Sequence, residues 1–319
     1  MKKIAVLTSG GDAPGMNAAI RSVVRTAIYN GVKIIGVKRG YCGLIEEDLS
    51  EMNLGSVSDI IHRGGTILGT ARCKEFYQEE GRRQAYETMR KYEIEGLVAI
   101  GGDGTFAGAL KLDALGIPVI AVPGTIDNDI ACTDRTIGFD TAVDTILDAI
   151  NKIRDTATSH GRIFVIEVMG RHSGVLALTA GLAGGAESIL IPEIPLDLEQ
   201  VVANIKRGVS RGKRHSIILL AEGVGGSLEI TQKIEEMTQL ETRLTILGYL
   251  QRGGTPTGED RNLASRMGAL AVKMLLAGER AKMTASAGDA ILGVDIAETL
   301  RQKKEINYED YQLAGILSR

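Results

Sequence analysis

The chain has 319 residues, a formal net charge of −3 and 44% hydrophobic residues, which predicts two domains with packed cores. Its near-neutral charge and its 4% aromatic content, with no tryptophan, argue against nucleic-acid partners. No apolar run is long enough to span a membrane or to serve as a signal core, so we expect no membrane partner. Three widely separated cysteines, Cys42, Cys73 and Cys132, show no metal-binding spacing and indicate thiols in a reducing, cytoplasmic compartment.

Apolar strands, glycine turns and helices alternate along the chain. The first unit is a strand at Ile4–Leu7, a turn at Thr8–Asp12 and an amphipathic helix at Met16–Asn30. Further strands are predicted at 33–38, 96–100, 117–122, 162–168, 216–220 and 242–250, helices at 81–92, 141–156 and 198–209, and a glycine turn at 181–187. This repeat predicts an α/β fold that is doubly wound, with a domain boundary near Phe139.

Glycine turns follow two of the predicted strands. Gly11 lies in the first turn, where backbone N–H groups can face a phosphate, although a plain tight turn explains it equally well. The second turn, Gly101–Thr105, runs into a G-x-G-x-x-A pattern, the loose form of the dinucleotide fingerprint. Its Asp103 would repel a bare pyrophosphate but can hold Mg²⁺ against phosphate oxygens. The turn therefore fits a metal–nucleotide better than NAD, and the chain has no P-loop motif.

The stretch Pro123–Asp129 follows the apolar run at 117–122. Pro123 cannot donate to a sheet ladder, so the strand is expected to end there. Two carboxylates, Asp127 and Asp129, then follow Thr125. Because ligands bind at the carboxyl ends of strands in open α/β sheets, these groups suggest a proton acceptor and its supporting residues. Taken alone, an Asx-rich turn explains the same residues.

Other residues with functional groups also follow predicted strands. They include Arg171, Glu222 and Arg252. Each has an ordinary explanation as a turn residue, a cap or a surface ion pair. Their repeated occurrence at strand carboxyl ends, together with Gly11 and Asp103, indicates a shared site instead.

These turns belong to a set of short motifs that spans the chain: TSGGDAPGMNAAIR at 8–21, GGDGT at 101–105, PGTIDND at 123–129, GFDTA at 138–142, EVMGRHSG at 167–174, AEG at 221–223 and LQRGGTPT at 250–257. In combination they resemble the ATP-dependent 6-phosphofructokinases of the bacterial type. The resemblance implies two doubly wound, Rossmann-like domains with mainly parallel sheets, the active site in the cleft between them, and a homotetramer. It implies an ATP-binding domain at 1–138 plus 251–301 and a fructose 6-phosphate-binding domain at 139–250 plus 302–319.

The resemblance implies transfer of the γ-phosphoryl group of MgATP to the 1-hydroxyl of fructose 6-phosphate. Asp127 would accept the hydroxyl proton, flanked by Thr125 and Asp129, and Arg72 and Arg171 would stabilise charge on the transferring phosphoryl. The implied ATP-binding residues are Gly11, Tyr41, Arg72, Cys73, Gly102, Asp103, Gly104, Thr105 and Gly108, with Asp103 as the Mg²⁺ ligand. The implied substrate-binding residues are Thr125, Asp127, Arg162, Met169, Gly170, Arg171, Glu222, Arg243, Tyr249 and Arg252.

The family also shares sites between subunits. By resemblance, Arg162 and Arg243 reach the 6-phosphate across an interface. Arg21 and Arg25 share a helix face apart from its apolar stripe, and a solvated basic face would explain them alone. The resemblance instead implies an effector site for ADP or phosphoenolpyruvate, with the residues Arg21, Arg25, Arg154, Gly185, Glu187, Arg211 and Lys213.

The chain departs from the family pattern at three positions. Tyr249 stands where a histidine on the sugar phosphate is usual, and a phenol cannot carry positive charge. Leu54 stands where some members have an effector-binding arginine. Gly161 stands where an acid usually precedes Arg162. We therefore expect effector binding with a blunted response.

Two alternatives stay open at this point. In pyrophosphate-dependent relatives an acid usually replaces Gly104 and a lysine replaces Gly124, so both glycines favour ATP. An NAD-binding oxidoreductase would use similar strand–turn units, but it lacks a clean fingerprint here, and Asp103 opposes it.

Overall fold

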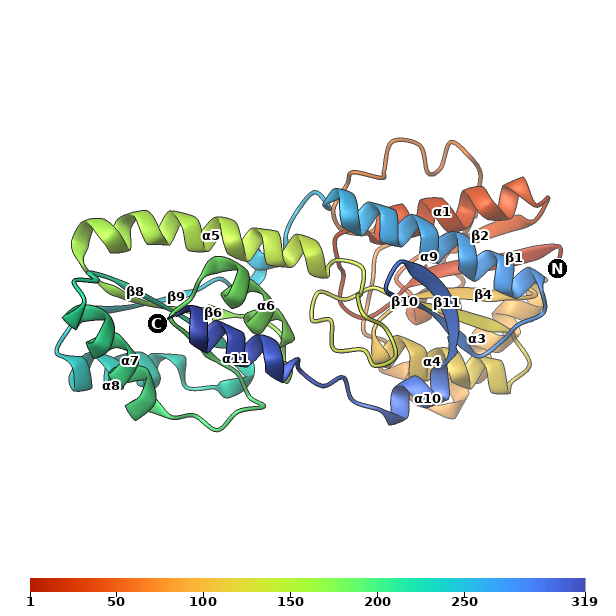
Figure 1. The fold of residues 1–319 in the computed structure, drawn as a ribbon. Helices are drawn as coiled ribbons and strands as arrows, with labels where there is room; N and C mark the ends of the chain where they lie inside the picture. The colour runs from red at the N-terminus through yellow and green to blue at the C-terminus, as the bar shows by residue number, and fades with distance from the viewer. Residues whose placement is uncertain (319) are drawn as a thin grey trace. The chain divides into compact units, whose positions relative to one another are not determined.

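The computed structural model describes residues 1–318, which form two compact units (Figure 1). The first unit comprises Met1–Ile126, Ile130–Thr141 and Gly254–Lys304. The second unit comprises Asp127–Asp129, Ala142–Gly253 and the residues from Glu305 onward. Each unit has its own sheet with helices packed against it.

The first unit is built on a seven-stranded sheet with the order β11-β10-β5-β4-β1-β2-β3. Its strands are β1 (Lys3–Thr8), β2 (Lys33–Val37), β3 (Leu49–Met52), β4 (Leu97–Gly101), β5 (Val119–Pro123), β10 (Lys282–Ala287) and β11 (Ala290–Asp295). The central strands pair in parallel, whereas the edge strands β3 and β11 pair antiparallel. All carboxyl ends of the central strands therefore meet at one edge.

Helices cover both faces of this sheet. In Figure 1, α1 (Met16–Tyr29) and α9 (Gly258–Leu276) lie on one face, and α3 (Glu79–Lys91), α4 (Asp103–Ala114) and α10 (Ile296–Arg301) lie on the other. Two short elements, α2 (Tyr41–Ile45) and the 3₁₀ helix η1 (Glu75–Tyr77), precede α3. Ala5 and Leu7 of β1 pack with Met89, Phe106 and Leu112 from α3 and α4. Because both faces are covered, the central strands are continuous apolar runs, which made them predictable.

The second unit has a four-stranded sheet with the order β7-β8-β6-β9, and all its strand pairs are parallel. The strands are β6 (Ile163–Val168), β7 (Ser188–Leu190), β8 (Ser216–Ala221) and β9 (Thr242–Ile246). The α-helices that contribute to this unit are α5 (Phe139–His160), α6 (Val175–Gly184), α7 (Leu198–Ser210), α8 (Ser227–Thr238) and α11 (Tyr308–Leu317). The predicted α/β fold class with mainly parallel sheets is confirmed.

Two predictions of local structure were wrong. The glycine-rich segment 181–187 is not simply a turn, because α6 continues to Gly184. A Cβ on Gly181 would lie 2.6 Å from the Ile189 side chain, and one on Gly184 would lie 2.8 Å from Ile150. These glycines therefore permit close helix packing. The extended run expected at 242–250 ends at Ile246, and a 3₁₀ helix, η3 (Gly248–Arg252), follows it.

Candidate functional site

The turns after β1 and β4 lie side by side because these strands are parallel neighbours. The hydroxyl of Thr105 donates to the carbonyl of Ser9 over 2.9 Å, and the N–H of Ser9 donates to the carbonyl of Ile100 over 3.1 Å. The fold therefore places the turn that contains Gly11 against the Gly102–Thr105 turn, at the carboxyl edge where α/β sheets bind ligands.

The first turn of α4 has room for a ligand. A Cβ built on Gly102 or Gly104 would meet no atom within 4 Å, whereas one on Gly108 would lie 2.7 Å from the Tyr41 ring. The Tyr41 hydroxyl donates to the carbonyl of Thr105 over 2.5 Å, and burial raises the pKa of this phenol. A helix N-terminus presents backbone N–H groups and the positive end of the helix dipole, so this turn can hold an anion.

The loop that ends in Arg72 is fastened to the same edge of the sheet. The Thr8 hydroxyl donates to the carbonyl of Gly69 over 2.8 Å, and the Thr70 hydroxyl donates to the carbonyl of Gly10 over 2.8 Å. Arg72 follows with an exposed side chain. A guanidinium carries five donors in a planar fork and is therefore suited to pair with a phosphate.

Asp103 is exposed at the first position of α4, directly after β4. One carboxylate beside an open phosphate-binding turn is the donor set that Mg²⁺ takes when substrate phosphates and water complete its shell. The residues present therefore fit Mg²⁺.

Two thiols that are distant in the sequence meet in the first unit. The ligand atoms of Cys42, Cys73 and Glu75 all lie within 4.8 Å of one another, although sequence spacing predicted no metal arrangement. The Cys73 thiol is 7% exposed and donates to the Glu75 carboxylate over 3.6 Å. Burial, followed by the hydrogen bond with Cys42, raises the pKa of Cys73 to about 12.

Asp127 of the second unit is a buried carboxylate beside a cation. Asp127 is only 4% exposed, and its Oδ2 lies 3.4 Å from Nε of Arg171. The neighbouring Asn128 is also buried and has a positive φ of 48°, so the segment turns sharply here. Asp129 is half-buried. The guanidinium offsets the charge of a carboxylate that would otherwise be costly to bury.

The backbone of Arg171 is fixed from both sides. Arg171 has a positive φ of 52°, and the preceding Gly170 has a φ of 134°, a conformation that other residues rarely adopt. The N–H of Arg171 donates to Oε1 of Glu222 over 2.7 Å. A Cβ on Gly223 would lie 2.3 Å from the Arg171 carbonyl oxygen, so glycine permits this contact. Residues held in such conformations cluster at functional sites.

Gln251 was not predicted as a site residue, yet it positions this turn. Its side chain is fully buried, and its Oε1 accepts from the N–H of Met169 over 2.8 Å. It lies in η3 between Tyr249, which is 88% exposed, and the half-buried Arg252. The glutamine amide thus connects the end of β6 to the LQRGG motif.

Arg162 and Arg243 lie together around Glu241, which sequence reasoning missed. Nε of Arg162 donates to Glu241 Oε2 over 2.6 Å, and the Arg243 guanidinium donates to Oε1. Arg162 directly precedes β6 and Arg243 lies in the first part of β9, and these two strands are parallel neighbours. The Arg162 hydrogen bond, with a smaller effect of Arg243, holds the pKa of Glu241 below its ordinary value.

Four of the predicted effector residues gather where α5 passes the segments that follow α6 and α7. We call Arg154, Gly185, Glu187 and Lys213 the effector cluster. Arg154 donates to the carbonyls of Gly184 and Gly185, the latter over 3.4 Å, and Lys213 donates to Glu187. Of the three remaining predicted cations, Arg211 directly follows α7, whereas Arg21 and Arg25 belong to α1 in the first unit.

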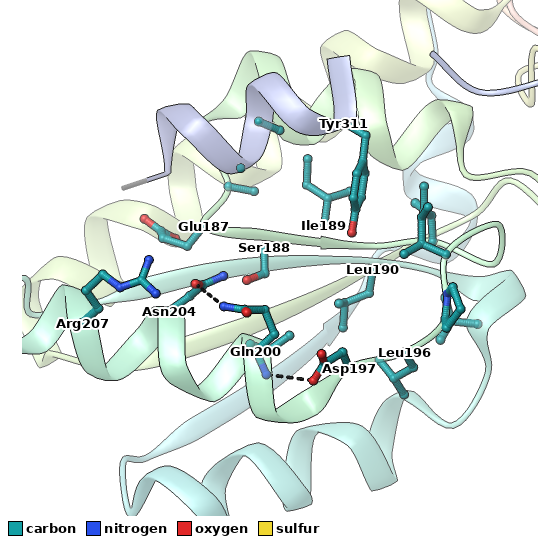
Figure 2. Close-up of a pocket in the computed structure, with 18 residues that line it drawn as sticks. Glu187, Ser188, Ile189, Leu190, Leu196, Asp197, Gln200, Asn204, Arg207 and Tyr311 are labelled. Atoms are coloured by element: carbon teal, nitrogen blue, oxygen red, sulfur yellow. Dashed lines mark hydrogen bonds between the residues drawn. The ribbon is translucent and has the colours of Figure 1, made fainter. Parts of the chain in front are cut away.

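Cavities adjoin the effector cluster on more than one side. A cavity of about 130 Å³ is lined by Arg207, Arg211 and Lys213, so three cations face one space. A larger one, about 490 Å³, lies at the outer edge of β7 between α7 and α11 (Figure 2). Its lining includes Glu187 and Arg207, so the two cavities share Arg207.

His215 also belongs to this region and was not predicted. Its Nδ1 lies 3.3 Å from the Thr158 hydroxyl. Partial burial, followed by the nearby Lys213 and Arg154 charges, lowers its pKa despite the opposing effect of Glu187.

Glycine turns at the carboxyl edge of a doubly wound sheet are typical of α/β enzymes that bind their ligands at that edge. The family model described as phosphofructokinase matches residues 3–275. The chain therefore belongs to the phosphofructokinase family and is a kinase. The predicted family is confirmed, and the alternative of an NAD-binding oxidoreductase was wrong.

Individual relatives agree with this assignment. The chain is 60% identical to the ATP-dependent 6-phosphofructokinase of Halothermothrix orenii and 57% identical to that of Bacillus subtilis, with 100% of both chains covered in each case. The phosphofructokinase structure from Saccharomyces cerevisiae has a TM-score of 0.88 at 36% identity and covers 100% of this chain and 48% of the yeast chain. A pyrophosphate-dependent phosphofructokinase from Marinobacter aquaeolei has a TM-score of 0.86 at 26% identity, with 97% and 86% covered.

In the described residues, 1–318, no helix has both the length and the apolar character that a membrane crossing requires.

Proposed function

We propose that the chain transfers the γ-phosphoryl group of MgATP to the 1-hydroxyl of fructose 6-phosphate, giving fructose 1,6-bisphosphate and ADP in cytoplasmic glycolysis. The observation that carries this proposal is the buried carboxylate of Asp127 with Arg171 at 3.4 Å. The names of the close relatives support the same reaction. The domain limits and the homotetramer that the resemblance implies belong to this proposal.

The residues of each unit have distinct roles in the proposed reaction. Asp127 accepts the proton of the sugar hydroxyl as that oxygen attacks phosphorus, and Arg171 stabilises the charge that develops there. Thr125 and Asp129 support the base from the same segment. Arg72 pairs with the phosphoryl group, and the N–H groups of the first α4 turn hold the nucleotide phosphates.

The sugar phosphate is bound by second-unit residues in this proposal. Glu222 accepts hydrogen bonds from sugar hydroxyls while it fixes the Arg171 backbone, and Met169 and Gly170 shape the pocket. The 6-phosphate is bound by Arg162, Arg243, Tyr249 and Arg252, with the first two acting across a subunit interface. Mg²⁺, when held by Asp103, neutralises charge on the phosphate oxygens.

Gly104→Asp is expected to weaken ATP use and to leave the fold intact. A Cβ at this position meets no atom within 4 Å, and an acid in the first turn of a helix is favourable. The added carboxylate would face the nucleotide phosphates, so kcat/KM for ATP should fall by about 10- to 100-fold, a loss on the order of one to three kcal/mol. The measurement is an aldolase-coupled assay with ATP or pyrophosphate as the donor.

Gly104→Asn is the matched control because it has the same size without the charge. It should stay within a few-fold of the parent enzyme. An enzyme that uses pyrophosphate better than ATP before any substitution would contradict the proposed donor. Equal losses in the two variants would show a steric effect instead.

We further propose that ADP or phosphoenolpyruvate binds at the effector cluster, with Arg21, Arg25 and Arg211 as additional cations. The cavity lined by Arg207, Arg211 and Lys213 supports this, because gathered cations repel one another unless an anion joins them. Glu187 would hold the Mg²⁺ of a bound diphosphate once the anion draws Lys213 away.

The double variant Arg25→Ala/Lys213→Ala is expected to lose any response to ADP or phosphoenolpyruvate with nearly unchanged maximal velocity. The reason is that both side chains would pair with the effector phosphate, outside the reacting centre. Fructose 6-phosphate saturation curves with and without each effector measure this. An equal response in the parent and the double variant would make these residues a solvated basic face. Calorimetric binding without any kinetic response would mean that the coupling is lost, as Leu54 and Gly161 suggest.

A further inference from the structure

The group formed by Cys42, Cys73 and Glu75 has the chemistry of a soft-metal site. The ligand atoms of its three side chains all lie within 4.8 Å of one another, and among residues 1–318 it is the only group of thiol, imidazole or carboxylate side chains that is this compact. Sulfur ligands about 2.3 Å from zinc at a tetrahedral angle lie roughly 3.8 Å apart, so small side-chain rotations suffice. Thiolate ligands favour zinc over magnesium, which prefers oxygen.

The two segments that carry these ligands are already held together. Cys42 lies in α2, and Glu75 begins η1. The adjacent rings of Tyr41 and Phe76 stack at 4.1 Å between centroids and 9° between planes. The hydroxyl of Tyr41 is anchored to the α4 turn. The backbone arrangement therefore exists before a metal binds, which lowers the entropic cost of assembling the ligands.

The ligands also differ in access to solvent. Cys73 is buried, Cys42 is half-buried and Glu75 is exposed, so an ion can enter from the Glu75 side. The exposed side leaves a fourth position for water, as in zinc sites with three protein ligands.

We propose that Cys42, Cys73 and Glu75 form a zinc-binding site in which both thiols bind as thiolates and release their protons. The site would connect α2 to η1, and it would occupy Cys73 and lie next to Tyr41, two residues that are expected to contact ATP. Zinc should therefore compete with the nucleotide, and this consequence, unlike zinc binding itself, rests on the proposed function.

The binding test uses the full-length enzyme, reduced with a phosphine and freed of metal. Zinc is titrated against a chromophoric chelator, and Co²⁺ reports the ligand set through thiolate charge-transfer bands. We expect one equivalent to bind to the parent enzyme and to Cys132→Ala, the matched control with an exposed thiol. Cys42→Ala should weaken binding by more than about 100-fold and Glu75→Gln by about 10-fold or more, because even outer-shell partners contribute roughly 10- to 100-fold.

Three results of the binding test would overturn the proposal, and a fourth would replace it with a redox pair. One is zinc binding by Cys42→Ala as tight as in the parent, and another is Co²⁺ binding without thiolate bands. The third is displacement of zinc by a moderate excess of Mg²⁺, which would indicate an oxygen site. A Cys42–Cys73 disulfide in air-exposed protein, with no zinc affinity in the reduced protein, would also replace the metal site with a redox pair.

The activity test separates this inference from the proposed function. Stoichiometric zinc should raise the KM for ATP of the parent and of Cys132→Ala, but not that of Cys42→Ala, whose activity without zinc should be unchanged. Zinc binding without any effect on ATP would keep the site and contradict its placement beside the nucleotide. An enzyme inactive with ATP would contradict the proposed function and leave the binding result intact.

Discussion

Asp127→Asn is expected to lower kcat by about 10²–10⁴ with little change in the KM for fructose 6-phosphate. The substitution keeps the shape of a side chain that is almost fully buried and removes its ability to accept a proton. The nearby Arg171 guanidinium then faces a neutral amide instead of a carboxylate, so its side chain is held less firmly in place. Steady-state assays at saturating ATP and sugar phosphate measure the effect.

Asp129→Asn is the comparison variant for this experiment, because it lies two residues away and is only half-buried. Its loss should be clearly smaller. A kcat within a few-fold of the parent for Asp127→Asn would remove this residue as the base. A large loss for Asp129→Asn alone would move the role to Asp129. Unchanged calorimetric binding of ATP to both variants confirms that the site is intact.

Asp260→Ala is expected to destabilise the enzyme by about 3–5 kcal/mol, because it leaves several buried donors without an acceptor. Asp260 is 1% exposed. It accepts from the N–H of Gly138 over 2.8 Å and from the N–H and hydroxyl of Thr141 over 2.8 and 2.5 Å. Urea denaturation followed by circular dichroism measures the change.

Glu259→Ala is the matched control, because the neighbouring carboxylate is half-exposed and pairs with Arg135 over 2.9 Å. It should cost no more than about 1 kcal/mol. Burial raises the pKa of Asp260 above the ordinary value of 3.8, in spite of its hydrogen bonds. Folding therefore favours the protonated form of Asp260. The stability that this form contributes is complete below about pH 3.8 and declines as the pH rises through the pKa of the folded state. Equal midpoints for the parent and Asp260→Ala would contradict this role.

Long-range partners explain why part of the site could not be predicted. The central strands and glycine turns were predictable because burial on both faces leaves uninterrupted apolar runs that end in polar residues. Asp260 and Gln251 act on backbone groups more than 80 residues away, and no local pattern indicates such pairs. The thiol group escaped notice for the same reason, since Cys42 and Cys73 meet only after folding.

Local signals also failed where packing decided the conformation. Gly181 and Gly184 indicated a turn by their propensity, yet they lie in α6 because Ile189 and Ile150 need the space that a side chain would fill. The short edge strand β3 (Leu49–Met52) was not predicted, because it has only four residues and two of them are exposed. The strand-end position of Asp127 suggested a proton acceptor, and the family resemblance gave Asp127 and Arg171 their implied roles, whereas only the structure supplied the contact between them.

The carboxylate of Glu241 acts as an internal counter-ion for Arg162 and Arg243. Two guanidinium groups can therefore stay close together at low ionic strength without repelling each other. In the proposed function, a 6-phosphate that binds Arg162 and Arg243 would exchange with this carboxylate, so its association would be a ligand exchange and not the filling of a bare cationic site. Exchange of this kind discriminates by charge, because a dianionic phosphate can displace a carboxylate that a neutral sugar cannot.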